Sequence, residues 1–288
     1  MLNAIGSAKA SKALGPNGIS TLMLKKLLPS SLDYLTEVYN LVVEKFQIPS
    51  IWKIARIVSI PKPGKHQNQG PSFRPISLLS PVAKILESLL LPQLQQHLSL
   101  KPHQHGFRKR RSTTTALTEL NTRIADGLNH SRPHWRTVVV ALDLSKAFDT
   151  VDHSILLNDI LYSPLPCFVK RFLSSYINGR SAYVEFRNRC SKHRKLKMGV
   201  PQGGVLSPIL FNFYISLLPQ PPPGIHLISY ADDCTIAASG VNVEDITIRI
   251  NGYLNQVASF FKERKLQLAS QKSSATLFTT WTKEVNDI

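Results

Sequence analysis

The chain has 288 residues, of which 43% are hydrophobic and 18% are charged. This length and apolar content exclude a wholly disordered chain and suit one large domain or two small ones, and three scattered cysteines exclude a disulfide framework. With 35 Lys and Arg against 18 Asp and Glu, the net charge of +17 favours a polyanionic partner, because cationic side chains neutralise phosphates.

The first third of the chain predicts helices around a short strand and a basic loop. Apolar residues at helical spacing predict a helix over 30–47, with Ser30 and Ser31 as candidate N-caps. The segment "IARIVSIPKPGK" predicts a short strand that leads into a Pro-Gly turn bearing lysines. A second helix is predicted through "LSPVAKILESLLL".

The middle of the chain predicts a further helix and a buried strand. The helix within "STTTALTELNTRIADGL" begins near Ser112 or Thr113 and places Leu117 and Ile124 on one apolar stripe. The valine-rich run "TVVVALDL" predicts a strand buried on both faces, and Asp143 lies at its end. Helices are predicted next in "SKAFDTVDHSILLNDIL" and "CFVKRFLSSYI", then a strand in "SAYVEF" and a basic ribbon turn in "RNRCSKHRKLK".

Near the end of the chain, a hairpin carries two adjacent acids. The glycine-rich loop and apolar helix of "GVPQGGVLSPILFNFYISLL" precede it, and an amphipathic helix with Val257 and Phe261 follows it. The strands "IHLISY" and "TIAAS" are joined by "ADDC", which puts Asp232 and Asp233 at the tip. Taken alone, such a pair is more often a solvated turn than a catalytic site.

Asp143 changes this balance, because it too ends a run apolar enough to be buried. Buried carboxylates that converge need a compensating charge, and a divalent cation supplies it. In a basic protein, such a group of carboxylate oxygens suggests a site for two metal ions that act on a phosphate ester. This spacing does not distinguish a polymerase from a nuclease.

Two long stretches of the chain are almost purely basic. Between residues 45 and 111 there are 12 Lys and Arg and one acid, Glu87, and between residues 170 and 197 there are nine and only Glu185. A solvated charged face explains either stretch alone. Together, and with an isoelectric point near 9.9, they favour nucleic acid as the partner.

The motifs, in their order along the chain, resemble those of the reverse transcriptases of non-LTR retrotransposons, close to the jockey and CR1 type. "ALGPNGIS" is similar to the N-terminal extension motif, and "IWKIARIVSIPKPGK", "SFRPISLLSPVAKILE" and "HGFRKRRSTTTAL" are similar to the fingers motifs. "VVALDLSKAFDTVDH", "GVPQGGVLSPILFNFYI" and "YADD" are similar to the palm motifs. The resemblance implies an α+β right-hand polymerase fold with an antiparallel palm sheet and a thumb that is largely absent. It implies an N-terminal extension of the fingers over 1–42 and a reverse transcriptase domain over 43–288, with fingers at 43–135 and palm at 136–288.

The resemblance also implies the metal site. Asp143 and Asp232 would hold two Mg²⁺ ions, with Mn²⁺ as an alternative, and the backbone carbonyl of Leu144 would be an additional ligand. Asp233 would support the site. Phe148 matches the bulky gate that selects deoxynucleotides, with ordinary core packing as its alternative role.

Further residues match the nucleotide-binding positions of the family. Lys62, Lys65 and Arg74 match the basic fingers positions that close on the triphosphate, and which lysine does so stays open. Gln202 lies on a glycine-rich loop and matches the nucleotide and template pocket. Lys272 matches a lysine that assists the leaving pyrophosphate, with an ordinary surface lysine as the alternative.

The sequence departs from the family pattern at two places near the site. Gly204 stands where these elements usually have Ser, and the usual Asn-Pro before Lys272 is missing. The chain begins at the extension motif and stops after the last palm motif, which implies a fragment of a larger polyprotein without its endonuclease and thumb segments.

The sequence therefore predicts an RNA-directed DNA polymerase that adds dNTPs to the 3′-hydroxyl of a DNA primer on an RNA template. One alternative is a catalytically inactive truncated copy that acts as a nucleic-acid-binding module. Another is a different palm enzyme, either an RNA-directed RNA polymerase or an intron maturase. No apolar run reaches about 18 residues and the start lacks a secretion signal, so we expect no membrane partner and a location in the nucleus or cytoplasm.

Overall fold

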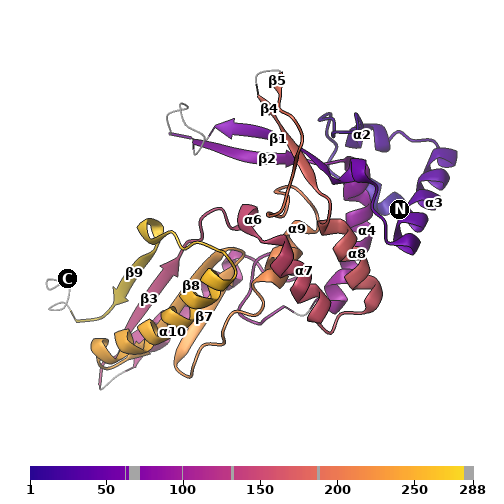
Figure 1. Cartoon of the computed structure of the whole chain (residues 1–288). Helices are drawn as coiled ribbons and strands as arrows, with labels where there is room; N and C mark the ends of the chain where they lie inside the picture. Colours follow the sequence, from indigo (N-terminus) through magenta and orange to yellow (C-terminus); the bar gives the residue numbers. More distant parts are fainter. Residues whose placement is uncertain (62, 65–71, 99, 131–132, 187–188, 282–288) are drawn as a thin grey trace. The chain divides into compact units, whose positions relative to one another are not determined.

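The chain divides into two compact units that each combine helices with a β-sheet, in agreement with the predicted α+β class (Figure 1). The computed structural model describes residues 1–61, 63–64, 72–98, 100–130, 133–186 and 189–281. Unit 1 consists of residues 1–99 and 148–210, and unit 2 consists of residues 100–147 and 211–288. Each unit is therefore built from two separate stretches of the chain.

Unit 1 opens with the helices α1 (Leu2–Ser7), α2 (Thr21–Leu24) and α3 (Pro29–Lys45). Helix α3 confirms the helix predicted over 30–47, but the predicted serine caps are wrong. Leu28 is the N-cap and Pro29 is the first helical residue, so Ser30 and Ser31 lie inside the first turn. Proline suits this position because its φ is already helical. It also lacks a backbone N–H, and at the first helical position an N–H would have no partner within the helix.

The sheet of unit 1 is mixed, with antiparallel and parallel neighbours. Its strands are β1 (Ile54–Pro61), β2 (Phe73–Leu78), β4 (Ser181–Phe186), β5 (Arg189–Cys190) and β6 (Arg194–Lys195). Strand β1, which follows the short helix η1 (Ser50–Lys53), pairs antiparallel with β2 and parallel with β4. Ala55, Leu79 and Ala182 form a small buried cluster here, against which Ile57 and Leu196 pack. The strands predicted in "IARIVSIP" and "SAYVEF" are confirmed.

In the described part of the chain, five more helices lie wholly or partly in unit 1, and two of them continue into unit 2. They are α4 (Pro81–His97), α6 (Ala147–Thr150), α7 (His153–Tyr162), α8 (Cys167–Ile177) and α9 (Ser207–Tyr214), of which α6 and α9 contain the boundaries. Ser80 caps α4 by accepting the N–H of Ala83, and Asp152 caps α7. Helix α8 buries Val169 and Phe172, as its apolar spacing predicts.

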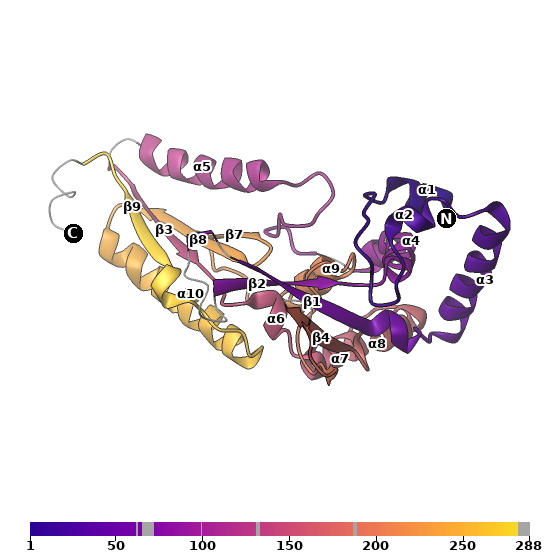
Figure 2. The same cartoon turned by 90° about the horizontal axis from the view of Figure 1, so that it is seen from above.

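The sheet of unit 2 is antiparallel throughout and has the order β7-β8-β3-β9. Its strands are β3 (Arg136–Leu142), β7 (Ile225–Tyr230), β8 (Asp233–Gly240) and β9 (Ser274–Phe278). The helices α5 (Thr113–Asn129) and α10 (Val243–Glu263) lie on opposite faces of this sheet (Figure 2). Val257 and Phe261 of α10 are buried, as predicted.

Strand β3 and helix α5 differ from the sequence prediction in how they are buried. Burial alternates over the first part of β3, where Thr137 and Val139 are buried and Val138 between them is only half-buried, so the predicted burial of both faces is wrong. Helix α5 packs through Gly127, where an added Cβ would lie 2.2 Å from Oγ1 of Thr137, while Leu117 of the predicted stripe is 57% exposed. Among the described residues, no helix is both long and apolar enough to cross a membrane.

Candidate active site

The two adjacent acids lie at the tip of the β7–β8 hairpin, as the sequence predicts. Tyr230 pairs with Asp233, so Ala231 and Asp232 form the turn. Ala231 is buried and has a φ of 57°, a left-handed conformation that is uncommon for a residue with a side chain. Asp232 is half-buried, and Asp233 is exposed. The turn therefore holds a carboxylate beside a strained backbone.

Asp143 comes to the same place from the neighbouring strand. Strand β3 pairs antiparallel with β8 up to Leu142, which is opposite Cys234. The next step of this register sets Asp143 opposite Asp233. The structure thus brings together the three carboxylates that the sequence singled out.

The carboxylates are close enough to repel one another. Burial raises the pKa of Asp232, the charges of Asp233 and Asp143 raise it further, and Lys272 opposes them. Partial desolvation raises the pKa of Asp233, and the charge of Asp143 adds to this. Burial and like charges both disfavour the ionised form, so this group of acids attracts cations.

Lys272 provides one positive charge to this group. It ends the short helix η3 (Ser270–Lys272), and its Nζ lies 2.8 Å from Oδ2 of Asp143. This hydrogen bond and the charge of Asp143 raise the pKa of Lys272. The lysine side chain is 68% exposed, so it combines an accessible surface position with direct contact to the predicted site.

The backbone around Leu144 is held in register with the segment that precedes Lys272. Leu144 forms an antiparallel bridge with Leu268, and the flanking bonds join Ala269 N to Asp143 O and Ser145 N to Gln267 O, each at 2.8 Å. In this pattern the bridged residues do not bond to each other. The carbonyl of Leu144 therefore points away from Leu268, to the side on which β8 pairs with β3.

The donor chemistry of the site fits a divalent cation. Within the described residues, no three or more His, Cys, Asp or Glu side chains form a group that could hold a metal ion. Mg²⁺ in polymerase sites does not need such a cage, because one or two carboxylates bind it together with substrate phosphates. Burial raises the pKa of Asp232 most, and the like charges of Asp233 and Asp143 raise it further. This unfavourable ionised state is the observation that favours a cation here, since a nearby positive charge would stabilise it.

The predicted nucleotide loop lies in unit 1. Nε2 of Gln202 donates to Oδ1 of Asp149 at 2.8 Å, and the carbonyl of Gln202 accepts the N–H of Ser77 at 3.1 Å. Gly203 has a φ of 124°, and an added Cβ would lie 2.8 Å from the carbonyl oxygen of Ser77. A glycine is required there because a side chain would collide with backbone.

Sequence reasoning missed Glu87 as a residue of this loop and noted it only as an isolated acid. Glu87 is 3% exposed, and its Oε2 accepts the N–H groups of Val205 at 2.7 Å and Leu206 at 3.0 Å. Burial raises the pKa of Glu87, and these two hydrogen bonds and Arg180 oppose the rise. A solitary acid within a largely apolar helix was the available signal.

The other predicted nucleotide-binding residues are placed only in part. Lys62 and Lys65 lie outside the described residues. The backbone of Arg74 belongs to β2. Phe148 is half-buried in α6, and its carbonyl accepts the N–H of Val200 at 2.8 Å. At Gly204 an added Cβ would lie 2.6 Å from Oγ of Ser207, so the serine usual in the family would require Ser207 to move.

Comparisons with known proteins agree with the motif order. Residues 60–286 match the family model for "Reverse transcriptase (RNA-dependent DNA polymerase)". The chain is 31% identical to the probable RNA-directed DNA polymerase from transposon BS of Drosophila melanogaster, over 97% of this chain and 32% of that protein. It is 26% identical to the RNA-directed DNA polymerase from mobile element jockey of the same organism, over 97% of this chain and 31% of that protein.

A solved structure shares the fold. Telomerase from Candida tropicalis, in complex with a fragment of telomeric RNA, superimposes with a TM-score of 0.56 at 14% identity, over 84% of this chain and 44% of that chain. The chain spans 32% and 31% of the two curated relatives named above. The family match over residues 60–286 covers most of the chain, and the relatives are polymerases of non-LTR elements, as the motifs indicated. This chain belongs to the reverse transcriptase (RNA-dependent DNA polymerase) family.

Proposed function

We propose that this chain carries the catalytic centre of an RNA-directed DNA polymerase of a non-LTR retrotransposon. The observation that supports this most directly is the meeting of Asp143 from β3 with Asp232 and Asp233 from the β7–β8 turn. The acids lie in a chain with a net charge of +17, which suits a nucleic-acid substrate. Membership of the reverse transcriptase family makes nucleotidyl transfer the reaction expected of this site.

The reaction joins a deoxynucleotide to a primer. The 3′-hydroxyl loses its proton to solvent as its oxygen attacks the α-phosphorus of the dNTP, the bond from this phosphorus to the bridging oxygen breaks, and pyrophosphate leaves with that oxygen. Two bound Mg²⁺ ions would supply the charge that activates the hydroxyl and stabilises the leaving oxygen. Asp143, Asp232 and the carbonyl of Leu144 would hold them, and Asp233 would support the site. Lys272, which contacts Asp143, is suited to donate to the leaving pyrophosphate.

The remaining predicted residues would bind the nucleotide. Lys62, Lys65 and Arg74 would contact the triphosphate, Gln202 would line the pocket and Phe148 would exclude a 2′-hydroxyl. The RNA template and DNA primer would be held through their phosphates by the basic stretches at 45–111 and 170–197. The division into an extension over 1–42, fingers over 43–135 and palm over 136–288, in a right-hand arrangement, is part of this proposal.

The test is primer extension by the purified chain on a poly(rA)/oligo(dT) duplex with dTTP and Mg²⁺. We expect extension by the wild type, and loss of extension in Asp232→Asn with nearly unchanged duplex binding. Asp33→Asn serves as a matched control, because Asp33 is exposed on α3 and belongs to no predicted site. Extension by Asp232→Asn at the wild-type rate would refute the site assignment.

Two further measurements separate this function from its alternatives. Preference for dTTP over UTP distinguishes a DNA polymerase from an RNA polymerase. Salt-dependent binding of the duplex without any extension by the wild type, at all Mg²⁺ and Mn²⁺ concentrations tried, would contradict catalysis by this chain and would identify a nucleic-acid-binding module.

A further inference from the structure

The turn that carries Asp232 has a backbone conformation that needs support from outside the hairpin. Ala231 precedes Asp232 and has a φ of 57°, which costs free energy for any residue with a Cβ. The direction in which the chain leaves Ala231 sets the position of Asp232. Whatever holds Ala231 therefore also determines where the carboxylate lies.

Gln104, from a segment 127 residues earlier, holds both polar groups of Ala231. Its Oε1 accepts the N–H of Ala231 at 2.9 Å, and its Nε2 donates to the carbonyl of Ala231 at 3.2 Å. Oε1 also accepts the N–H of Gly106 at 2.8 Å. Two N–H groups directed at one atom identify it as the carbonyl oxygen, which fixes the orientation of this buried amide.

Gly106 brings the same segment against the turn. An added Cβ at Gly106 would lie 2.3 Å from the backbone nitrogen of Ala231, so no side chain fits there. The carbonyl of Gly106 accepts Nδ2 of the buried Asn212 at 2.9 Å. The neighbouring backbone pairs with β7, since the N–H of Ser229 donates to the carbonyl of His103 at 2.8 Å and the carbonyl of Ser229 accepts the N–H of His105 at 2.7 Å.

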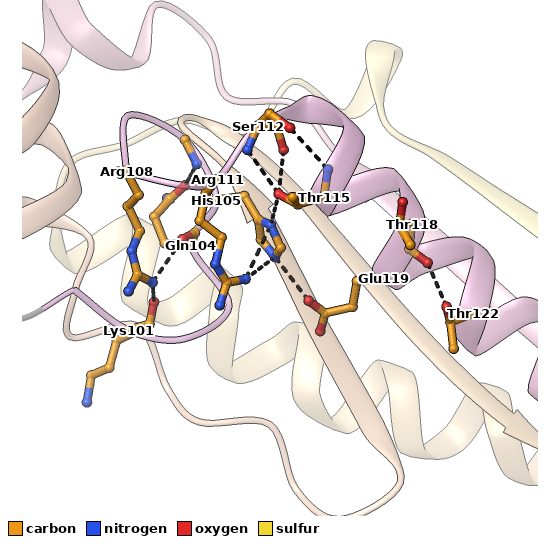
Figure 3. A network of polar contacts seen from close by, with 11 residues as sticks. Lys101, Gln104, His105, Arg108, Arg111, Ser112, Thr115, Thr118, Glu119 and Thr122 are labelled. Carbon is orange, nitrogen blue, oxygen red and sulfur yellow. Dashed lines mark hydrogen bonds and ion pairs between the residues drawn. The ribbon is translucent and has the colours of Figure 1, made fainter.

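The segment of Gln104, His105 and Gly106 also contacts helix α5. His105 is 1% exposed, its Nδ1 lies 2.9 Å from Oγ1 of Thr115, and its Nε2 lies 3.0 Å from a carboxylate oxygen of Glu119 (Figure 3). Both ring nitrogens thus contact residues of α5. The helix is fixed at its start by a capping box between Ser112 and Thr115. The amide of Gln104 is therefore presented by a segment held on two sides.

We propose that Gln104 is a positioning residue of the polymerase: it holds Ala231 in the left-handed conformation that places the Asp232 carboxylate for metal binding. The role rests on the proposed function, because it matters only if Asp232 binds metal. Gln104 contacts the backbone of the turn, so it acts through Asp232. Residues that orient a metal ligand without contacting the metal themselves affect metal affinity or activity strongly.

The variants are chosen to remove the two hydrogen bonds and then to remove the need for them. Gln104→Met keeps the length of the side chain and removes both bonds to Ala231, together with the bond from the N–H of Gly106 to Oε1. Ala231→Gly removes the cost of a positive φ, because glycine adopts it freely. The double variant combines the two changes. Gln256→Met is the matched control, since Gln256 is exposed on α10.

In primer extension, Gln104→Met is expected to lower kcat by about 10- to 100-fold, as misplaced metal ligands do. KM for dTTP and Kd for the duplex are expected to change by less than about twofold, because binding outside the reacting centre is unaffected. The double variant is expected to regain most of the lost kcat. A general loss of packing would give no such rescue, and failure of Ala231→Gly to restore kcat would overturn the role assigned to Gln104.

A second readout does not depend on turnover. We expect Mg²⁺ to raise the unfolding temperature of the wild type and of Gln256→Met, and to leave that of Asp232→Asn unchanged. Gln104→Met is expected to need about 10-fold more Mg²⁺ for the same rise. If Gln104→Met does not fold, Gln104→Asn, which keeps the amide but shortens its reach, takes its place with the same expectation.

The two readouts separate the inference from the proposed function. Normal kcat and Mg²⁺ dependence in Gln104→Met, with an active wild type, would overturn the positioning role and leave the polymerase standing. An inactive wild type whose Mg²⁺ response is the same in Asp232→Asn would overturn the proposed function. If the wild type is inactive but its Mg²⁺ response requires Asp232, the unfolding temperatures decide the role of Gln104. A higher Mg²⁺ requirement in Gln104→Met that the double variant reverses would support the role, and an unchanged requirement in Gln104→Met would overturn it.

Discussion

Glu87 allows a stability prediction whose size follows from its contacts. Its Oε2 alone accepts both N–H groups, from Val205 and Leu206, at the start of α9. Glu87→Ala leaves these two groups without an acceptor in a largely buried place. Glu87→Gln can place its amide oxygen where Oε2 lies and keep both bonds. The two variants therefore separate the hydrogen bonds from the charge.

The expected magnitudes differ enough to be resolved. A buried N–H without a partner costs about 1–3 kcal/mol, so Glu87→Ala, which leaves two of them, should lose about 2–6 kcal/mol. Glu87→Gln should change the free energy of unfolding by less than about 1 kcal/mol, because the amide oxygen keeps both bonds and burial outweighs what the charge gains from them. At a slope of about 1–3 kcal/mol per molar urea, the alanine variant should unfold at least about 0.3 M earlier than the glutamine variant.

The assay is urea unfolding followed by tryptophan fluorescence of unit 1. The chain has three tryptophans, and only Trp52 belongs to unit 1, so Trp135→Phe and Trp281→Phe make the signal specific. Glu185→Ala is the control, because Glu185 forms a partly exposed ion pair with Arg56 and should cost less than about 1 kcal/mol. Equal destabilisation by Glu87→Ala and Glu87→Gln, or no more than in Glu185→Ala, would refute the reasoning.

Two further predictions concern the pH dependence of folding and the choice of nucleotide. Burial, helped by Lys101, lowers the pKa of His103 from 6.5 to about 4. The unfolded chain then binds more protons between these values, so stability should fall as the pH drops from 6.5 to about 4, and urea midpoints of His103→Gln should lack this fall. The other charged or titratable groups around the ring are His105, Arg108 and Glu119. Phe148→Ala should raise UTP incorporation relative to dTTP, and an unchanged ratio would exclude Phe148 as the gate.

The sequence was sufficient to predict the elements that depend on local patterns. The β7–β8 hairpin follows from alternating apolar residues, with Asp232 and Asp233 forced to its tip. Helix α5 begins after Ser112 because its hydroxyl accepts the N–H of Thr115. Predicting that Asp143 lies beside the hairpin required the further hypothesis that the two acid-bearing segments are buried next to each other. The register of β3 with β8 agrees with this hypothesis.

The sequence was not sufficient where contacts join distant residues. Gln104 meets Ala231 across 127 residues, and no local pattern marks a glutamine whose amide fits one particular turn. Gly106 looked like an ordinary loop glycine until the structure set the backbone of Ala231 against it. The prediction that Leu117 lies on the buried stripe of α5 is wrong for a related reason. Helix α5 approaches the sheet closely at Gly127, so the small face of the helix is buried and the larger residue is left exposed.

Two acids of this basic chain share a raised pKa but differ in what offsets the cost of burying them. Burial raises the pKa of Glu87, and the N–H groups of Val205 and Leu206 offset part of this cost within the protein while they hold the loop that carries Gln202. Asp232 has a raised pKa, so the folded protein binds its proton more tightly than the unfolded chain, and stability falls as the pH rises through that raised value. Ionised Asp232 therefore costs stability at neutral pH, and Asp232→Asn removes this cost together with the proposed activity. A divalent cation bound only to the folded state would offset the same cost, which ties metal binding to folding at this turn.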